Sequence, residues 1–200
     1  GVLELDDVPG SVVVIGGGYI GTEYAHFLAA MGAEVTVLQR GERLVPDEEP
    51  EVSELLKKRL GERIDVRTGA DVKAVRSESG GRVVTATGAS DEALEFRADA
   101  VLLAAGRRSN ADLLDVEKAG IETDGRGYIV AGDDFSTSAE NIWAFGDIIG
   151  RAMFTHVARR EAVLAWHNSM HDDAVEMDYS AVPHAVYTWP QIASVGATEQ

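Results

Sequence analysis

The chain has 200 residues, no cysteine and a formal net charge of −16, from 34 acidic and 18 basic side chains. The lack of cysteine excludes disulfide bonds and thiolate metal sites within it, and the acidic surface argues against nucleic acid and anionic membranes as partners. No apolar run approaches the roughly 20 residues that span a bilayer, and the start of the chain lacks the basic segment of a secretory signal. We therefore expect a cytoplasmic protein. Because the acids are spread along the whole chain, adaptation to high salt is favoured over an ordinary acidic cytosolic protein.

The first elements predict a βαβ unit. The apolar run Val12–Ile15 ends at Gly16 and is typical of a strand buried on both faces of a parallel sheet. A helix follows, ending near Gly32, with its predicted apolar face formed by Ile20, Tyr24, Phe27, Leu28 and Met31. Residues 34–38 are rich in β-branched side chains and predict the second strand.

The rest of the chain predicts further α/β structure in three parts. For residues 1–106 we expect a second helix from 47–51 to 60, parallel strands at 64–67 and 100–104, and between them a β-meander of strands at 71–77, 82–87 and 94–97. For residues 107–175 we expect a short helix at 113–119, a strand at 141–145 and a helix at 155–171. The last part, 176–200, contains Pro183 and Pro190 and is expected to be extended.

The glycine-rich turn carries the clearest chemical signal. Gly16, Gly18 and Gly21 form a G-x-G-x-x-G between the first predicted strand and helix. The first glycine permits a tight turn, the second lets the backbone approach a diphosphate, and the third lets helix and strand pack closely. The helix N-terminus then favours the anion. This context predicts a dinucleotide site rather than a glycine-rich turn without a ligand.

The residue that ends the second strand bears on the choice between NAD and NADP. An acid there would bind the ribose hydroxyls of NAD, but the sequence has Gln39, followed by Arg40 and Arg43. A neutral side chain with guanidinium groups nearby suits the 2′-phosphate of NADP. Glu42 is a competing signal, and both arginines could equally be solvated turn residues.

Four segments together resemble the pyridine nucleotide–disulfide oxidoreductases, a family that includes dihydrolipoamide dehydrogenase and the glutathione, mycothione and mercuric reductases. Residues 13–23 (VVIGGGYIGTE) resemble the family's NAD(P) motif, and residues 104–110 (AAGRRSN) resemble the stretch that leads out of its nucleotide domain, although Ala105 and Ser109 depart from the usual residues. Residues 141–147 (NIWAFGD) resemble its second FAD motif, and residues 182–196 resemble the first strands of its dimerisation domain. The resemblance implies an NAD(P)-binding domain at 1–106, the C-terminal segment of an FAD-binding domain at 107–175, and the start of an α+β dimerisation domain at 176–200.

The resemblance also implies cofactor contacts. For NAD(P) these involve the three glycines together with Tyr19 as a gate over the nicotinamide, Ile20, Glu23 beside the flavin and nicotinamide, Gln39, Arg40, Ala105 and Gly106. For FAD, Gly146 and Asp147 would meet the ribitol. The following helix would point its start, at Met153, Phe154 and Thr155, at the flavin, where a positive helix end stabilises the reduced ring. Simpler interpretations remain open: Tyr19 as a core aromatic, Glu23 as a solvated acid, and Gly146–Asp147 as a plain turn.

The family's other parts do not occur in this sequence. Its first Rossmann unit, its redox-active cysteine pair and its C-terminal His-Glu pair are absent, so we expect an internal fragment with no catalytic residue of its own and no metal site. The parent enzyme would be a homodimer that transfers hydride between NAD(P)H and FAD and acts on a dithiol or disulfide, either lipoamide or a low-molecular-weight thiol. Dihydrolipoamide dehydrogenase is the first expectation. An NADPH-dependent mycothione-, glutathione- or mercuric-reductase-like enzyme is the alternative, and a non-catalytic nucleotide-sensing Rossmann module is an alternative of another class.

Overall fold

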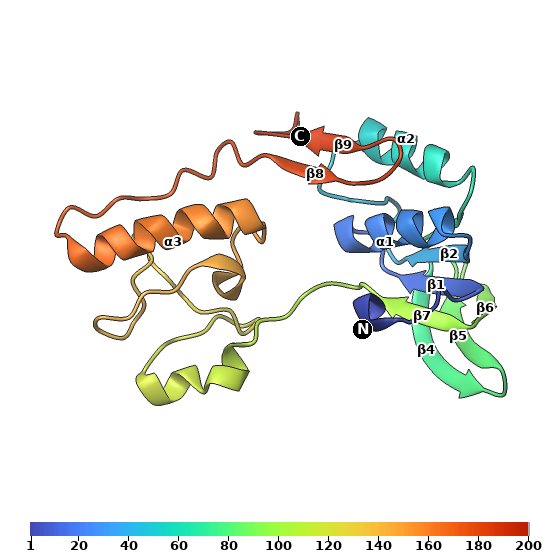
Figure 1. Ribbon diagram of the computed structural model, residues 1–200, viewed down its shortest axis with the longest axis horizontal. Helices are drawn as coiled ribbons and strands as arrows, with labels where there is room; N and C mark the ends of the chain where they lie inside the picture. The colour runs from blue at the N-terminus through green and yellow to red at the C-terminus, as the bar shows by residue number, and fades with distance from the viewer. Residues whose placement is uncertain (200) are drawn as a thin grey trace. The chain divides into compact units, whose positions relative to one another are not determined.

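A computed structural model of the protein describes residues 1–199, which form two compact units (Figure 1). Unit 1 comprises Gly1–Gly106, Ala185–Ser194 and residues 198–199; unit 2 comprises Arg107–His184 and Val195–Ala197. Each unit is described by itself. None of the described helices is both long and apolar enough to cross a bilayer.

Unit 1 is built on a four-stranded parallel sheet. After a short 3-10 turn, η1 (Val2–Glu4), its strands are β1 (Ser11–Ile15), β2 (Glu34–Gln39), β3 (Asp65–Thr68) and β7 (Ala100–Leu103), in the spatial order β3-β2-β1-β7. Every neighbouring pair is parallel. The connections are α1 (Tyr19–Ala30) after β1 and α2 (Pro50–Leu60) after β2. The predicted α/β class with a parallel sheet is confirmed.

The central strand β1 is buried because the sheet is covered on both faces. Val12 and Val14 pack in one core cluster with Leu28 of α1 and Leu56 of α2. Val13 and Ile15 point to the other face, where they pack with Val84 and Ala98 of the β-meander. This two-sided burial explains the continuous apolar run in the sequence. Figure 1 shows the helices and the meander on opposite sides of β1 and β2.

The meander consists of β4 (Asp71–Glu78), β5 (Gly81–Thr87) and β6 (Ala93–Ala98), paired antiparallel in chain order. It leads directly into β7, which was expected to be a buried strand. The structure makes β7 an edge strand, and Leu103 at its end is 74% exposed. The burial prediction was wrong at this strand because only β1 flanks it among the described residues.

Helix α1 occupies the predicted residues, and the predicted apolar face is confirmed at Leu28, which is buried, and in part at Tyr24, which is half-buried. Ile20, Phe27 and Met31, all expected on the apolar face, are 40%, 52% and 56% exposed. The buried residues are Gly21, Thr22, Ala25 and Leu28. Small side chains on this face let the helix axis come close to the sheet, so contact distance, and not hydrophobicity alone, selects the buried face.

Unit 2 is mostly irregular and centres on one long helix, α3 (Thr155–Met170). Three 3-10 turns precede it: η2 (Ala111–Leu114), η3 (Val116–Ala119) and η4 (Gly146–Ile149). Its core surrounds Phe135, which is fully buried, with Val116, Ile149 and Leu164. The strand predicted at 141–145 was wrong: only an isolated bridge pairs Trp143 with Ser136. The positive φ of 61° at Asn141 interrupts the extended backbone there.

The C-terminal part forms a two-stranded sheet of β8 (His184–Val186) and β9 (Ile192–Ser194). Val186 is completely buried in the core of unit 1 that contains Leu28 and Leu56. The expectation that 176–200 begins a dimerisation domain stays a prediction, and residue 200 lies outside the described residues.

Candidate functional site

The glycine turn, residues 16–21, connects β1 to α1 and is shaped by two close backbone contacts. Gly16 has φ +109°, and a Cβ added there would lie 2.4 Å from the carbonyl oxygen of Ala104. A Cβ on Gly21 would lie 1.9 Å from the carbonyl oxygen of Gly16. Neither position has room for a side chain, so the packing of unit 1 alone requires glycine at both.

Gly18 differs from its neighbours because a Cβ at this position would meet no atom within 4 Å. Its φ of −79° is accessible to any residue. Neither sterics nor backbone conformation therefore explains this glycine within the protein itself. A diphosphate that approaches the backbone closely at a helix N-terminus requires such a position, with no Cβ and with open space in front of it.

The glycine turn lies at the reversal point of the sheet. The chain moves from β1 to β2 on one side, whereas β7 lies on the other side of β1, and the turn follows the carboxyl end of β1. In open α/β sheets, ligands bind at this kind of crevice. Gly18 caps α1 without a side-chain hydrogen bond, so the start of the helix offers backbone N–H groups to an anion.

Gln39, at the end of β2, holds the glycine turn with its side-chain amide. Its Oε1 accepts from the Gly17 N–H at 2.9 Å, and its Nε2 donates to the Arg43 carbonyl at 3.2 Å. The Gly17 carbonyl in turn accepts from the Val45 N–H at 2.8 Å. Gln39 thus joins the glycine turn to the loop after β2, a role that the sequence did not indicate.

The charged residues after Gln39 are accessible. Arg40 and Glu42 are exposed, and Arg43 is half-buried. Among residues 1–199 neither arginine forms a salt bridge, although the charge of Arg40 helps to lower the pKa of Asp71, after the larger effect of Lys73. On the other side of β1, Ala105 and Gly106 follow β7 and are exposed, with Gly106 at φ +126°.

Tyr19 and Glu23, on the first turns of α1, already have partners in unit 1. Tyr19 is half-buried against the helix-side core, the cluster that contains Leu28 and Leu56. Burial, and then the nearby carboxylates of Glu48 and Asp47, raise the pKa of its hydroxyl to about 12. Glu48 is only 5% exposed and also accepts from the Ser194 hydroxyl at 2.5 Å. Glu23 accepts from the Tyr187 N–H at 2.9 Å, while Ile20 between them is exposed. Sequence reasoning missed Glu48, whose partners come from distant segments.

The candidate flavin-contacting residues of unit 2 come together around one arginine. Asp147 lies in η4, hereafter the Asp147 turn (Gly146–Ile149), with its side chain 61% exposed. The Nη1 of Arg107 lies 3.4 Å from the Asp147 carboxylate and donates to the Met153 carbonyl at 2.9 Å. Arg107 thus links the Asp147 turn to the start of α3, and it was not singled out from the sequence.

The start of α3 has no side-chain cap. Phe154 is the N-cap residue and Thr155 the first helical residue, and the Phe154 ring stacks on the rings of His156 and His184 at centroid distances of 5.7 and 5.5 Å. The backbone N–H groups of the first helical turn therefore receive no capping side chain. An anionic or electron-rich group is favoured at such a helix end.

Glu161, one of the largest fully buried residues, lies on the inner face of α3. Its Oε2 accepts from the Gly146 N–H at 2.6 Å and its Oε1 from the Tyr179 hydroxyl at 2.6 Å. Burial and the hydrogen bond to Glu161 raise the pKa of Tyr179 to about 12. Sequence reasoning missed Glu161, although an acid between Val157 and Leu164 interrupts an apolar helical stripe and could have marked it.

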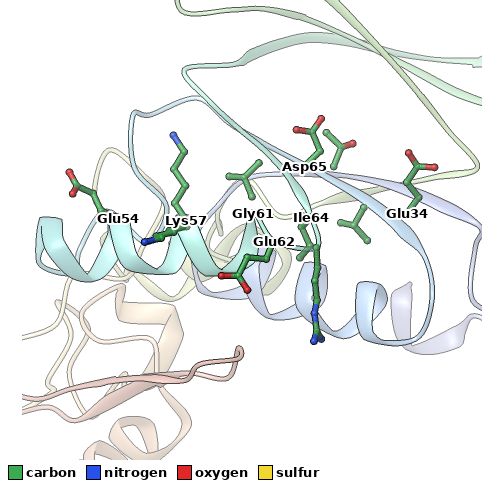
Figure 2. Close-up of a pocket in the computed structure, with 12 residues that line it drawn as sticks. Glu34, Glu54, Lys57, Gly61, Glu62, Ile64 and Asp65 are labelled. Carbon is green, nitrogen blue, oxygen red and sulfur yellow. The ribbon is translucent and has the colours of Figure 1, made fainter.

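A shallow hollow of about 790 Å³ also opens on unit 1 (Figure 2). It lies between α2 and the amino ends of β2 and β3, where Glu34, Lys57 and Asp65 line it. The Lys57 ammonium donates to the Thr68 hydroxyl at 2.7 Å. The glycine turn is at the carboxyl ends of the strands, so this hollow is not part of the candidate dinucleotide site.

Comparison with known proteins agrees with this geometry. The sequence pattern of the family described as "Pyridine nucleotide-disulphide oxidoreductase" matches residues 1–162. The chain is 40% identical over 199 residues to a dihydrolipoyl dehydrogenase of Haloferax volcanii, covering 98% of this chain and 42% of that protein. It is 37% identical to a mercuric reductase of Streptomyces lividans, covering 98% and 41%.

Solved structures show the same fold. The flavoprotein disulfide reductase RclA of Escherichia coli superposes with a TM-score of 0.89 at 30% identity, covering all of this chain and 44% of that one. LpdA of Mycobacterium tuberculosis superposes with a TM-score of 0.86 at 26% identity, covering 97% and 42%. The chain spans less than half the length of these relatives. By its sequence pattern and its fold, the chain belongs to the pyridine nucleotide-disulphide oxidoreductase family.

Proposed function

We propose that unit 1 binds a pyridine dinucleotide at the glycine turn, with the diphosphate at the start of α1. Proteins of this family use FAD and NAD(P). The residues assigned to the dinucleotide are Gly16, Gly18, Tyr19, Ile20, Gly21, Glu23, Gln39, Arg40, Ala105 and Gly106. The observation that carries the proposal is the open space in front of Gly18, beside two glycines that packing alone explains.

In unit 2 the proposal assigns FAD to the Asp147 turn and the start of α3. The residues are Gly146, Asp147, Met153, Phe154 and Thr155. FAD and the pyridine nucleotide supply the hydride chemistry when bound. The chain's own residues would orient the cofactor. Asp147 offers an exposed carboxylate to the polyol hydroxyls, and Arg107 holds that carboxylate next to Met153. The uncapped start of α3 supplies a positive helix end.

The whole protein is proposed to pass electrons between NAD(P)(H), FAD and a dithiol or disulfide. Dihydrolipoamide dehydrogenase is the favoured activity, since relatives at 40% and 37% identity carry the name dihydrolipoyl dehydrogenase. The proposed substrate is lipoamide or a low-molecular-weight thiol, and the proposed state of the whole enzyme is a cytoplasmic homodimer. These assignments concern more than this chain, which covers about 42% of such relatives.

A second candidate, an NADPH-dependent reductase of the mycothione, glutathione or mercuric type, is favoured by the loop after β2. Because the Gln39 amide is engaged with Gly17 and Arg43, and is not a carboxylate, it is a poor acceptor for a ribose hydroxyl. Arg40 is exposed, Arg43 is half-buried, and neither forms a salt bridge among residues 1–199, so both can meet a 2′-phosphate. A mercuric reductase is among the relatives.

Substitution of Gly18 tests the site. In Gly18→Ala, the added methyl occupies space that is open in the protein, so stability should fall by about 1 kcal/mol or less, the cost of a poorer N-cap. The methyl obstructs the diphosphate, so calorimetry should show at least a tenfold loss of affinity for both NADH and NADPH. Glu54→Gly, an exposed change in α2 that costs about 1 kcal/mol, is the matched control and should bind normally. Unchanged affinity in Gly18→Ala would contradict the proposed site.

Substitution of Arg40 tests the choice of cofactor. If Arg40 holds a 2′-phosphate, the wild-type chain should bind NADPH more tightly than NADH, and Arg40→Glu should reverse the order by removing a cation and adding a repulsive charge. Equal wild-type affinities would contradict the NADPH assignment but not the dinucleotide site itself.

Substitution of Asp147 tests the alternative from another functional class, the nucleotide-sensing module. That alternative is favoured if the wild-type chain binds a pyridine dinucleotide and Asp147→Asn leaves the affinity for FAD unchanged.

A further inference from the structure

Glu161 is a fully buried carboxylate with no cationic partner. It is 0% exposed, lies on the α3 face that also buries Val157 and Leu164, and forms no ion pair with residues 1–199. An acid in such surroundings is costly unless its oxygens are hydrogen-bonded. An apolar residue of the same size would pack at this position without that cost, so the carboxylate calls for a specific explanation.

The two oxygens of Glu161 hold two separate segments. Oε2 accepts from the Gly146 N–H and Oε1 from the Tyr179 hydroxyl, both at 2.6 Å. These are the short distances of hydrogen bonds to a charged acceptor. Gly146 has φ +76°, and a Cβ on it would lie 3.3 Å from the Ala158 Cβ, so the Asp147 turn sits directly against α3.

The hydrogen bond from the Gly146 N–H to Glu161 fixes the backbone immediately before Asp147. Asp147 follows Gly146 immediately, and its carboxylate lies beside Arg107, which also holds the Met153 carbonyl. The Asp147 turn is therefore held from both sides: Glu161 holds its backbone from the interior, and Arg107 contacts its side chain near the surface.

We propose that Glu161 is a positioning residue that orients the Asp147 turn relative to the start of α3, so that Asp147 and the first helical N–H groups face the same ligand. The ligand class, a flavin with its polyol chain, rests on the proposed function of unit 2. Glu161 itself touches no ligand and acts through Gly146. The Tyr179 hydroxyl donates a hydrogen bond to the second oxygen of the Glu161 carboxylate.

The amide of Gly146 reports directly on this role. In ¹⁵N-labelled protein the Gly146 N–H should resonate far downfield and exchange slowly, as expected for a short bond to a carboxylate. Glu161→Gln keeps the size and one acceptor but removes the charge. It should move the Gly146 and Asp147 resonances upfield and speed Gly146 exchange by about tenfold or more. Tyr179→Phe should affect Gly146 less, since it binds the other oxygen.

Val157→Ala is the control for a general loss of stability, because it removes buried volume from the same helix and leaves Glu161 in place. If Glu161→Gln changes Gly146 no more than Val157→Ala does, the positioning role is overturned. Flavin fluorescence titration of the same variants separates this proposal from the assignment of FAD. Absence of FAD binding by the wild-type chain would count against the flavin assignment, while the Gly146 amide still decides the role of Glu161. If the wild type binds FAD, Glu161→Gln should weaken it severalfold and Val157→Ala should not.

Discussion

Gln39 uses both ends of its side-chain amide, as an acceptor toward Gly17 and as a donor toward the Arg43 carbonyl. A carboxylate at this position could replace only the first contact and would place its second oxygen against the Arg43 carbonyl. The residue type at the end of β2 is therefore constrained by the glycine turn, independently of any contact with the proposed dinucleotide. This constraint favours a site in which the arginines after Gln39, and not the strand-end residue, recognise the ribose.

A substitution at Gln39 should separate the two constraints. We expect Gln39→Glu to lower the stability of unit 1 by about 1–3 kcal/mol, because the Arg43 carbonyl loses its donor and faces a negative charge. Affinity for both NADH and NADPH should fall together, because the shape of the turn is disturbed. Chemical denaturation and calorimetry measure the two effects. A variant of unchanged stability that gains NADH affinity would contradict the bracing role and restore Gln39 as a direct specificity residue.

Single residues also mark how far sequence reasoning reaches. Gly16, Gly18 and Gly21 could be assigned from spacing, because their roles depend on a local strand–turn–helix unit. The helical pattern could have marked Glu161 as an unusual position, but the partners of Glu48 and Glu161 could not be predicted, because Ser194 and Tyr179 come from segments that only the tertiary structure brings near. Residue spacing predicts local geometry, but it does not predict hydrogen bonds between segments that are far apart in the sequence.

At the scale of elements, the meander carries a closed ring of four exposed charges above Val83. Arg76 of β4 contacts Glu78 and Glu95, and Arg97 of β6 contacts the same two acids. Hydrogen bonds from Arg97 to Glu78 and from Arg76 to Glu95 hold the pKa of both carboxyls below the ordinary value. The ring thus links β4 to β6 across the intervening strand β5.

The ring should make the meander sensitive to acid. Carboxyls whose pKa is lowered by folding stabilise the fold above their unfolded pKa, and this contribution disappears as the pH falls through the lowered pKa. Arg97→Ala should therefore lower stability at neutral pH and flatten the loss of stability between neutral and acid pH. Thermal unfolding followed by circular dichroism over a pH series checks this, and added salt should shrink the difference between variant and wild type. Identical pH profiles would show that the ring contributes nothing measurable.

Helices and strands were predictable where hydrophobic burial or a turn-forming residue alone determines the backbone. The parallel strands and the meander followed from apolar runs and turn residues, and their positions agree with β1 to β7. Hydrophobicity predicted the buried face of α1 only at Leu28 and in part at Tyr24, because close packing selected Gly21 and Ala25 over Phe27 and Met31. The strand expected at 141–145 failed for a local reason, the left-handed backbone at Asn141.

At the scale of the whole molecule, chain order and structural unit do not coincide. Residues 185–194 come after the long segment 107–184 of unit 2 in the sequence, yet Val186 is completely buried in the core of unit 1. Glu23 and Glu48 hydrogen-bond to Tyr187 and Ser194 of this segment. The C-terminal strands thus contribute to the stability of the nucleotide-binding unit. From the sequence, the same segment was expected to begin a separate dimerisation domain, an expectation that only an assembled enzyme can test.

Truncation of Val186 should therefore be felt in unit 1. Val186→Ala leaves a cavity in the helix-side core and should destabilise that unit by about 1–3 kcal/mol. Scanning calorimetry with and without pyridine nucleotide identifies the transition of unit 1 as the one that the ligand shifts. We expect the variant to lower this transition and to leave the other in place. A change confined to the transition that nucleotide does not shift would contradict the assignment of residues 185–194.

The contact of Gly16 with Ala104 has a consequence for biosynthesis. Within unit 1 the turn is made before both helices and the meander, whereas the backbone against which it closes is made after them. Until β7 aligns with β1, one wall of the crevice does not exist, and the long intervening segment must first be closed into a loop. A nascent chain that pauses within β6 would carry all three glycines of the turn but lack one side of the proposed site, so we expect cofactor capture to follow the synthesis of β7.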